Sequence, residues 1–307
     1  MNGKNYPLIS IIFPNWNGKK DTIECINSLR NLEYPKDRLE IIIIDNASND
    51  GSQQIIKQKF DQLKQEGWFA LILIENERNV GPTIARNRGI RAVYKNYDYI
   101  WMMDNDIVVN KDALKVMLKI SETTPKIGII GSVNYYFSNP KKICPCGGHL
   151  KLKFGRYKFI EINERDINKT DVLSVDYVFS CSLLIKKQTI QNIGLLNPYY
   201  FWGFNDIDWC IRAKKAGYEV IIAKNSKIWH KISSSTKKVS GFNTYFNTRN
   251  LIIFIKKNFS KSNYIKFLAY ILIINMPWKT ILFFIKGMFT QISYLYKGLV
   301  DGLVFKK

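Results

Sequence analysis

Four apolar segments of β type recur in the first third of the chain, and each ends in a cluster of polar residues. They span residues 8–13, 39–44, 69–74 and 99–103. Between them, apolar residues such as Ile23, Ile26 and Leu29 recur at helical spacing. Strands that alternate with helices build a parallel sheet with right-handed crossovers. Because ligands bind beyond the carboxyl ends of such strands, we expect the binding site where these polar clusters meet.

Two aspartates, Asp104 and Asp106, stand directly after the fourth apolar segment. At the end of a buried strand they would face the crevice. Such a pair can hold a hard divalent cation, and Mg²⁺ or Mn²⁺ bound by few carboxylates takes its other ligands from water and substrate phosphates. Taken alone, the pair also suits a solvated acidic turn. The polar clusters after the other three strands favour the metal site.

The order of the motifs resembles a known enzyme family. PNWN begins at residue 14, IDNASNDGS at 44, NVGPTIARNRG at 79 and DND at 104. Later blocks are VDYVFSCSLLIKK from 175, GFNDIDWCIRAKKAGYEV from 203 and WH at 229. Together they resemble glycosyltransferase family 2, and the later blocks resemble its rhamnosyltransferase-like branch. The resemblance implies the GT-A fold, an α/β architecture with a Rossmann-like nucleotide-binding sheet and helices on both faces.

The resemblance also implies a division of the chain. Residues 1–230 would form the GT-A catalytic domain, with a nucleotide-sugar-binding half up to about 110 and an acceptor-side half over about 111–230. Residues 231–307 would form a C-terminal amphipathic or hydrophobic helical region. A chain of 307 residues, 46% of them hydrophobic, can bury one large core or two closely joined subdomains.

By resemblance, we expect a metal-dependent, inverting glycosyltransferase. It would move a sugar from dTDP-rhamnose or a UDP-sugar to a lipid-linked, polyprenyl-linked or growing glycan acceptor. Motif position makes Asp106 the principal ligand of Mn²⁺ or Mg²⁺ and Asp104 a metal or ribose contact, while His230 completes the metal shell. Asp206 matches the Asp of the family's Glu-Asp pair. It is the expected catalytic base, because the acceptor hydroxyl must lose a proton.

One position departs clearly from the family pattern, since Asn205 stands where Glu usually precedes the Asp. An amide cannot act as a base, but it can hydrogen-bond a sugar or orient Asp206. Asp208 competes for the role of base, although its spacing from Arg212 favours a helical ion pair. Trp202, in the preceding aromatic run, suits a sugar pocket. The departure keeps open a nucleotide-sugar-binding protein without activity.

Residues of the first half are expected to bind the nucleotide. Asp45 can accept a hydrogen bond from a pyrimidine base, and Arg86 can reach the diphosphate or the base. The other donor-binding candidates are Pro14, Asn15, Trp16, Asn79, Gly81, Asp104 and, for the donor sugar, Asp176. Each also has a structural alternative, as a turn former or as part of a solvated surface.

The charge is strongly positive and unevenly placed. The net charge is +21, and residues 251–307 hold nine lysines but a single acid, Asp301. Such a charge implies an anionic partner or surface. No nucleic-acid-binding motif accompanies it, so we expect no nucleic-acid partner, and a basic nucleic-acid-binding protein is the least favoured alternative.

The same tail contains apolar runs over residues 267–278, 280–285 and 287–296, separated by Lys279 and Lys286. Each is shorter than the ~20 residues that a membrane-spanning helix needs. Pro277 should break or kink the array. We therefore expect helices that lie in the interface of an anionic membrane. Capping of the catalytic domain or a contact within an oligomer is the alternative.

The first ten residues contain no apolar signal core, and the five cysteines lack regular spacing. Both features fit a reducing, cytoplasmic compartment, where nucleotide sugars are available. We expect a peripheral protein on the inner face of the cell membrane. Cys144, Cys146 and His149 do not match a usual zinc spacing and lack a clear fourth ligand.

Overall fold

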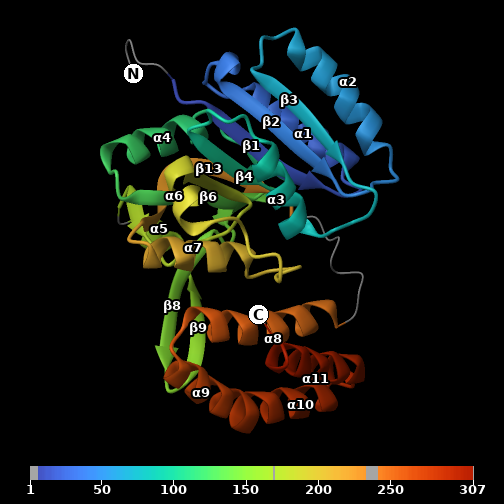
Figure 1. Cartoon of the computed structure of the whole chain (residues 1–307), viewed down its shortest axis with the longest axis vertical. Coiled ribbons are helices and arrows are strands. Elements are labelled where there is room, and N and C mark those ends of the chain that lie inside the picture. Colours follow the sequence, from blue (N-terminus) through green and yellow to red (C-terminus); the bar gives the residue numbers. More distant parts are fainter. Residues whose placement is uncertain (1–5, 169, 233–240, 307) are drawn as a thin grey trace.

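The computed structural model describes residues 6–168, 170–232 and 241–306 (Figure 1). The strands are β1 Ile9–Asn15, β2 Leu39–Asp45, β3 Ala70–Glu75, β4 Tyr99–Met103, β5 Ile107–Val109, β6 Ile127–Tyr136, β7 Asn139–Ile143, β8 Gly147–Lys153, β9 Arg156–Glu161, β10 Val172–Ser174, β11 Tyr177–Val178, β12 Ser182–Lys186 and β13 Glu219–His230. The helices are α1 Lys19–Arg30, α2 Ser52–Lys64, α3 Pro82–Ala92, α4 Ala113–Thr123, α5 Glu164–Asn168, α6 Lys187–Ile193, α7 Asn205–Lys215, α8 Phe242–Asn258, α9 Lys261–Tyr270, α10 Met276–Ile285 and α11 Phe289–Leu303. A short 3₁₀ turn, η1, covers Lys36–Arg38, and a π-helical turn, η2, covers Ile271–Asn275.

The predicted parallel sheet is present as one part of a larger mixed sheet. Its main path runs β10-β13-β6-β12-β4-β1-β2-β3, while β5 pairs with β13 and β7 with β6. The four predicted strands β3, β2, β1 and β4 are parallel neighbours. β12 enters antiparallel between β4 and β6. This insertion joins the two halves of the sheet, so the carboxyl end of β4 lies near the middle.

Helices cover both faces of the sheet, as expected. Successive residues of β1 alternate between two cores: Ile11 and Phe13 pack with α1 and α2, and Ile12 packs on the opposite face with α3. Strands buried on both faces read as continuous apolar runs, and all seven residues of β2 are buried. That burial is why these strands were recognisable in the sequence.

Helices α8 to α11 form a separate layer, which we call the C-terminal helical layer, and the hairpin of β8 and β9 reaches it (Figure 1). α11 packs closely on α8 because Gly298 and Gly302 lack side chains. A Cβ at Gly298 would lie 2.6 Å from the Tyr245 carbonyl oxygen, and one at Gly302 would lie 3.0 Å from the Ile252 Cβ. The two glycines therefore let the helix backbones approach.

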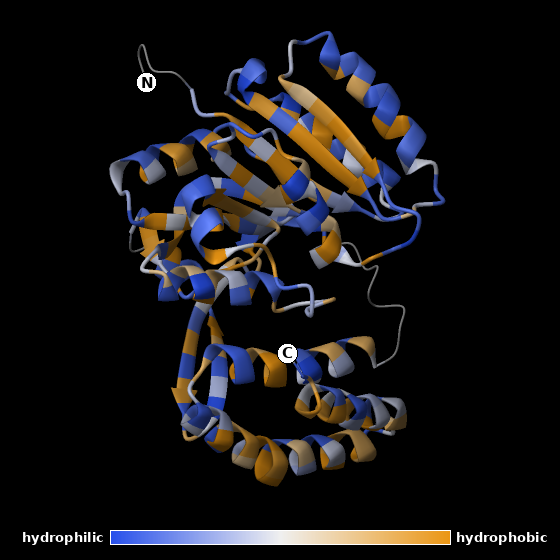
Figure 2. Cartoon of the chain, in the orientation of Figure 1, coloured by the Kyte–Doolittle hydropathy of each residue, from blue (hydrophilic) through white to orange (hydrophobic). Residues whose placement is uncertain are grey.

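The expectation of several short helices in this region was wrong. α9, η2 and α10 form one continuous helix, Lys261–Ile285, which runs through Pro277. Proline removes one backbone hydrogen bond, and the wider π-helical turn just before it accommodates the change. The helix is long and apolar enough to cross a membrane by length and composition alone. Figure 2 shows hydrophobic residues along it.

Candidate active site

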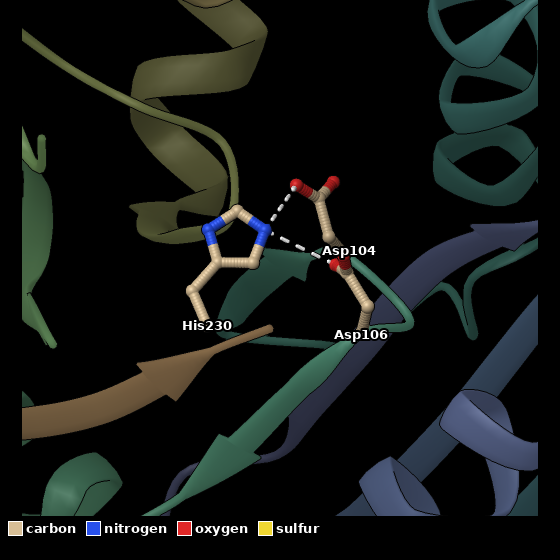
Figure 3. Close-up of side chains that lie close together, drawn as sticks. All are labelled: Asp104, Asp106 and His230. Carbon is tan, nitrogen blue, oxygen red and sulfur yellow. Dashed lines mark ion pairs between the residues drawn. The ribbon is translucent and has the colours of Figure 1, made fainter. Parts of the chain in front are cut away.

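Three metal-ligating side chains meet beyond the carboxyl end of β4: Asp104, Asp106 and His230 (Figure 3). His230 reaches the aspartates because β13 pairs antiparallel with β5, which places His230 opposite Ile107. One carboxylate oxygen of each aspartate and one ring nitrogen of His230 lie within 4.8 Å of one another. His230 Nε2 is 3.1 Å from Asp106 Oδ1 and 3.9 Å from Asp104 Oδ2.

This donor set fits a divalent cation. Neighbouring ligands of an octahedral ion at about 2.1 Å lie about 3 Å apart, close to the shorter of these distances. Two carboxylates and one imidazole suit Mn²⁺ better than Ca²⁺, because imidazole is a ligand of transition metals. Asp106 and His230 are largely buried, and Asp104 is half-buried, so the cluster remains open on the Asp104 side. A substrate phosphate could approach there.

The surroundings of His230 favour positive charge. Burial alone lowers the pKa of His230, but hydrogen bonds with Asp106 and with the thiols of Cys144 and Cys181 outweigh it, so the pKa lies well above its usual range. The two carboxylates thus stabilise a cation at this point, whether an imidazolium or a metal ion. The hydrogen bonds with the two thiols help to hold the imidazole in its orientation.

Arg86 on α3 links the metal cluster to a second acidic group. Arg86 is 5% exposed, and its guanidinium forms an ion pair with Asp104. Burial raises the pKa of Asp206, and the charge on Arg86 opposes this rise. The Nε of Arg86 is buried and has no hydrogen-bond partner among the described residues. A buried donor without a partner costs free energy, so this N–H is suited to an oxygen-rich ligand.

The loop before α3 lies against the aromatic segment that precedes Asp206. Asn79 Oδ1 accepts a hydrogen bond of 2.9 Å from the Gly81 N–H. Gly81 has a φ of +80°, and a Cβ there would lie 2.6 Å from the Phe201 ring. Glycine is therefore required by both the backbone and the contact. This contact brings the two halves of the predicted site together.

Asp206 lies in the first turn of α7 and is 7% exposed. Its carboxylate accepts hydrogen bonds from the Ser180 N–H at 3.1 Å and the Ser180 hydroxyl at 3.3 Å. Burial raises the pKa of Asp206 above its ordinary value, although these bonds and the charge on Arg86 oppose the rise. Phe204, just before α7, has a φ of +64°. Such strained conformations in non-glycine residues cluster at functional sites.

Asn205 and Trp202 lie beside Asp206 with different surroundings. Asn205 is 4% exposed, and its Nδ2 has no hydrogen-bond partner among the described residues. Trp202 is half-buried, and its carbonyl accepts a hydrogen bond of 2.7 Å from Asn250 Nδ2 on α8. The hydrogen bond from Asn250 of the C-terminal helical layer therefore fixes the backbone at Trp202. The Nδ2 of Asn205 can donate to a ligand.

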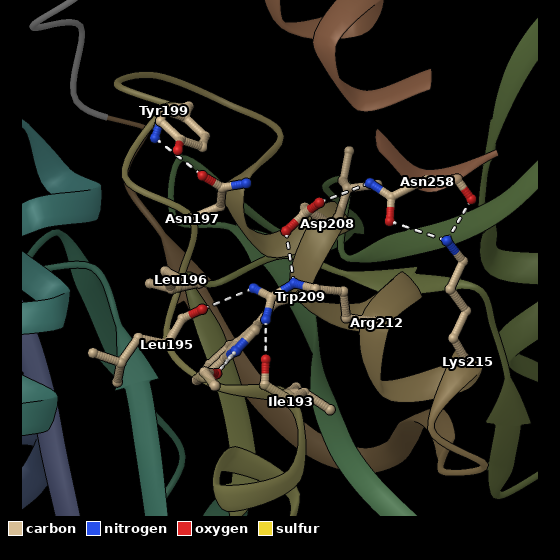
Figure 4. Close-up of polar contacts among 12 residues, drawn as sticks. Ile193, Leu195, Leu196, Asn197, Tyr199, Asp208, Trp209, Arg212, Lys215 and Asn258 are labelled. Atoms are coloured by element: carbon tan, nitrogen blue, oxygen red, sulfur yellow. Dashed lines mark hydrogen bonds and ion pairs between the residues drawn. The ribbon is translucent and has the colours of Figure 1, made fainter. Parts of the chain in front are cut away.

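Asp208 holds neighbouring segments together, and it pairs with Arg212 as their spacing predicts (Figure 4). It is 2% exposed and accepts hydrogen bonds from Arg212 Nε at 2.9 Å and Asn258 Nδ2 at 2.7 Å. Arg212 also donates to the carbonyls of Ile193 and Leu195. Asp208 thus joins α7 to the preceding loop and to α8, which leaves Asp206 as the better candidate for a base.

At the ends of β1 and β2, the predicted nucleotide-binding residues form a hydrogen-bonded cluster. Asn15 is 1% exposed and donates to Asp45 Oδ2 at 2.7 Å. Asp45 also accepts from the N–H and the hydroxyl of Ser48 and from Gln53 Nε2. These four bonds occupy the acceptor sites of a carboxylate, so a base contact would have to replace one. Contact between Asp45 and a base stays a prediction.

The outer rim of this cluster is formed by Pro14 and Trp16. Pro14 is half-buried, and Trp16 is 48% exposed. An exposed tryptophan next to a buried polar cluster suits the edge of a base pocket, because its ring can stack on a base without rearrangement.

The contacts of Asp176 lie away from the metal cluster. It pairs with Lys214, accepts a hydrogen bond of 2.8 Å from the Leu150 N–H and lies 3.6 Å from His149 Nδ1. These contacts lower the pKa of Asp176 despite its partial burial, which alone would raise it. Lys214 already compensates the charge of Asp176, and the contacts of Asp176 join neighbouring segments of the chain. A role of Asp176 at the donor sugar stays a prediction.

Several residues of the site had no sequence signal strong enough to identify them. Ser180, which donates to Asp206, is one of them. Arg86 was predicted to bind the donor, but its ion pair with Asp104 was not expected. Asn105, between the two aspartates, donates to Asn15 at 3.0 Å and Thr22 at 2.9 Å. The position of Asn105 beside the acidic pair was the one available clue. Buried polar side chains are usually hydrogen-bonded, so these bonds of Asn105 are expected once its partial burial is known.

Comparisons with known proteins agree with the motif order. The family described as "Glycosyl transferase family 2" matches residues 10–189, more than half of the chain. The chain is 25% identical over 220 residues to glycosyltransferase AglE of Haloferax volcanii, covering 71% of this chain and 64% of the relative. It is 30% identical over 183 residues to abequosyltransferase RfbV of Salmonella typhimurium, covering 59% and 53%. The matches thus span less than two thirds of these relatives.

Among solved structures, the fold is similar to that of the mannosyltransferase PcManGT from Pyrobaculum calidifontis in complex with GDP-Man and Mn²⁺. The TM-score is 0.64 at 16% identity, over 99% of this chain and 89% of that one. At this identity the likeness concerns the fold, which is GT-A. From the family match, the chain belongs to glycosyl transferase family 2.

Proposed function

We propose that this member of glycosyl transferase family 2 moves a sugar from a nucleoside diphosphate to a hydroxyl group of a lipid-linked or growing glycan acceptor, with inversion at the anomeric carbon. One observation carries the proposal: Arg86 pairs with Asp104 of the Asp104, Asp106 and His230 cluster, and its charge also acts on the buried carboxylate of Asp206. A cation site next to a carboxylate base is what this transfer requires.

Asp104, Asp106 and His230 would hold Mn²⁺ or Mg²⁺. When bound, such a cation neutralises the negative charge that grows on the departing diphosphate. Arg86 adds a positive charge of the protein to that of the cation. Its Nε–H can donate a hydrogen bond to the diphosphate, because it has no partner among the described residues. The donor set favours Mn²⁺, and PcManGT was solved with Mn²⁺ and GDP-Man.

Asp206 would take the proton of the acceptor hydroxyl. The acceptor oxygen forms a bond to the anomeric carbon, the bond from that carbon to the diphosphate breaks, and the proton moves to the Asp206 carboxylate. A raised pKa improves Asp206 as a base, because it brings the pKa closer to the working pH. Ser180 holds the carboxylate in place through two hydrogen bonds.

The identity of the donor is a finer proposal. The later motifs favour the rhamnosyltransferase-like branch and hence dTDP-rhamnose, with a UDP-sugar as the alternative. Asn15, Asp45 and Trp16 would surround the base, with Pro14 at the rim. The unpaired Nδ2 of Asn205 supports a hydrogen bond to a sugar oxygen, which a Glu at this position could not donate. We place the reaction at the cytoplasmic face of a membrane, where nucleotide sugars are available.

The test is a panel of dTDP-, UDP- and GDP-sugars, each with Mn²⁺, Mg²⁺ or a chelator. A donor at 100 times its Kd should stabilise the folded chain by about 2.7 kcal/mol, and only with the cation present. The same donor should then be transferred or slowly hydrolysed by the wild type. Metal-dependent binding without any turnover would instead identify a nucleotide-sugar-binding protein. Binding of no donor would overturn the proposal.

A further inference from the structure

The helix Lys261–Ile285 exposes large apolar side chains that no part of the described chain covers. Only 11% of its most apolar 18-residue window is buried. Exposed fractions are 73% for Ile273, 64% for Phe284 and 76% for Ile285. The full set of exposed apolar residues on the helix is Ile265, Leu272, Ile273, Ile274, Trp278, Ile281, Phe284 and Ile285. A contiguous surface of this kind marks a protein or membrane interaction site.

One side of this helix is packed against the protein. Phe267, Ile271 and Met276 are almost fully buried, and they stand four and then five residues apart. The π-helical turn supplies the extra residue that keeps all three on one side. Phe267 contacts Tyr157 of β9, with ring centroids 5.7 Å apart. The helix is therefore fixed lengthwise on the molecule, with its other sides facing out.

We propose that the helix Lys261–Ile285 lies in the plane of an anionic membrane surface, with its exposed apolar residues among the lipid chains. This inference goes beyond the proposed sugar transfer and does not depend on it. The charges favour this occupant over a second copy of the chain. Lys261, Lys266 and Lys286 are exposed on and beside the helix, and residues 251–307 hold a single acid. Anionic lipid attracts these lysines, whereas a second copy would repel them.

The tip of the β8–β9 hairpin extends the same surface. Phe154 is 90% exposed and has a φ of +50°. Its neighbour Gly155 packs against the backbone of α9, where a Cβ would lie 2.3 Å from the Lys266 carbonyl oxygen. A phenylalanine in a left-handed turn with almost no protein contact is unfavourable in water. Insertion into a lipid interface would bury its ring.

Packing at the two ends of the helix argues for an in-plane position rather than a span. After Gly287 the chain returns as α11, and Gly298 and Gly302 bring α11 against α8. α8 precedes the helix and α11 follows it. If the helix crossed the bilayer, α8 and α11 would stand on opposite sides and lose this contact. Both helix ends should therefore remain on one side of the membrane.

The first test is sedimentation of the full chain with vesicles of phosphatidylcholine, with or without phosphatidylglycerol. We expect binding to the anionic vesicles that weakens with added salt. Ile273→Asp combined with Ile285→Asp should weaken it about a hundredfold or more, because two exposed isoleucines that would enter the lipid are replaced by charges. Phe69→Asp is the matched control, since Phe69 is 41% exposed but lies beside β3. Absence of binding at low salt, or equal loss in the control, would overturn the proposal.

The second test distinguishes lying in the plane from crossing. All five native cysteines are buried, so a cysteine introduced at either end can be labelled selectively. Ser262→Cys and Lys286→Cys should both react with a membrane-impermeant maleimide added outside sealed vesicles. Reaction at one end alone would show a spanning helix and overturn the in-plane position. Protection of both ends without vesicles, at rising protein concentration, would identify a second copy as the occupant.

Discussion

The sheet and the C-terminal helical layer use similar apolar residues in opposite ways. In β2 every residue is buried, whereas in the helix Lys261–Ile285 most apolar residues are exposed. Helices of the same chain cover both faces of the sheet. In the layer, the described chain covers only one side of the helix Lys261–Ile285. An apolar run in a sequence therefore predicts burial, but only the structure shows whether the chain itself provides the cover.

Polar residues differ between the two regions in the same way. At the ends of β1, β2 and β4, polar side chains hold one another in a hydrogen-bonded cluster, with Arg86 Nε and the Asn205 amide left over for a ligand. On the helix of the layer, Lys261 and Lys266 are exposed and Lys279 is half-buried, and the exposed Lys286 follows directly. The first arrangement suits one shaped ligand, and the second suits a surface of diffuse negative charge.

The sharpest test of the sheet region is its proposed base. Asp206→Asn should lower turnover by about 10² to 10⁴, because the amide cannot accept the acceptor proton. Donor affinity should stay nearly unchanged, which titration calorimetry can measure. The amide that replaces the carboxylate would fit the same space and still accept a hydrogen bond from Ser180. If turnover persists in the variant, Asp206 is not the base.

The same variant has a predictable pH dependence of stability. Burial raises the folded-state pKa of Asp206 above its ordinary value of 3.8. A raised pKa contributes stability below the unfolded value, and that contribution is lost as the pH rises through the folded value. Asp206→Asn should therefore gain stability over the wild type as the pH is raised from strongly acidic to neutral. Urea unfolding at several pH values checks this, and a constant difference would contradict it.

Asp208 tests whether the sheet and the layer are held together by one buried group. Asp208→Asn should cost about 3 kcal/mol of unfolding free energy, because the Arg212 guanidinium loses its buried counter-charge. The bond from Asn258 of α8 is lost as well, since the amide that replaces the carboxylate offers fewer acceptor sites. Chemical denaturation measures the change. Asp61→Asn, on the exposed face of α2, is the control and should be neutral.

The metal cluster predicts a binding effect of slightly smaller size. Asp106→Ala should weaken Mn²⁺-dependent binding of a nucleoside diphosphate about a hundredfold, because a metal ligand matters at least as much as the groups that orient it. Calorimetry with and without Mn²⁺ isolates the metal-dependent part. Asp61→Ala should bind as the wild type does. Undiminished binding in Asp106→Ala would remove this aspartate from the metal site.

The smallest effect concerns single charges of the layer. Lys286→Gln should weaken binding to anionic vesicles about fivefold, since each lysine near such a surface contributes about 1 kcal/mol. The salt dependence should also become shallower. Lys279 is half-buried, and burial lowers its pKa, so Lys279→Gln should change the binding less. Equal effects at both positions would show that the attraction does not depend on exposure.

The family resemblance predicted His230. Local patterns in the sequence predicted the strands and the acidic pair, because strand ends of one sheet must meet. They could not identify the Arg86 ion pair with Asp104 or the support of Asp206 by Ser180. The Ser180 contact depends on β12 entering antiparallel beside β4, a tertiary event without a local signal. The continuous helix was missed for another reason. Lys279 and Pro277 predict interruptions of the helix, whereas a π-helical turn carries it past the proline.

The contact at Gly81 connects parts of the molecule that have separate tasks. Phe201 lies against Gly81 on one side, and its ring stacks on Phe246 of α8 at a centroid distance of 5.5 Å. A displacement of the helical layer would therefore move Phe201 and, with it, the loop at the start of α3. Binding of the helical layer to a lipid surface would then restrict the motion of the Phe201 contact and of the Gly81 loop. The loop that is proposed to bind the donor would be more rigid in the lipid-bound enzyme than in the free enzyme.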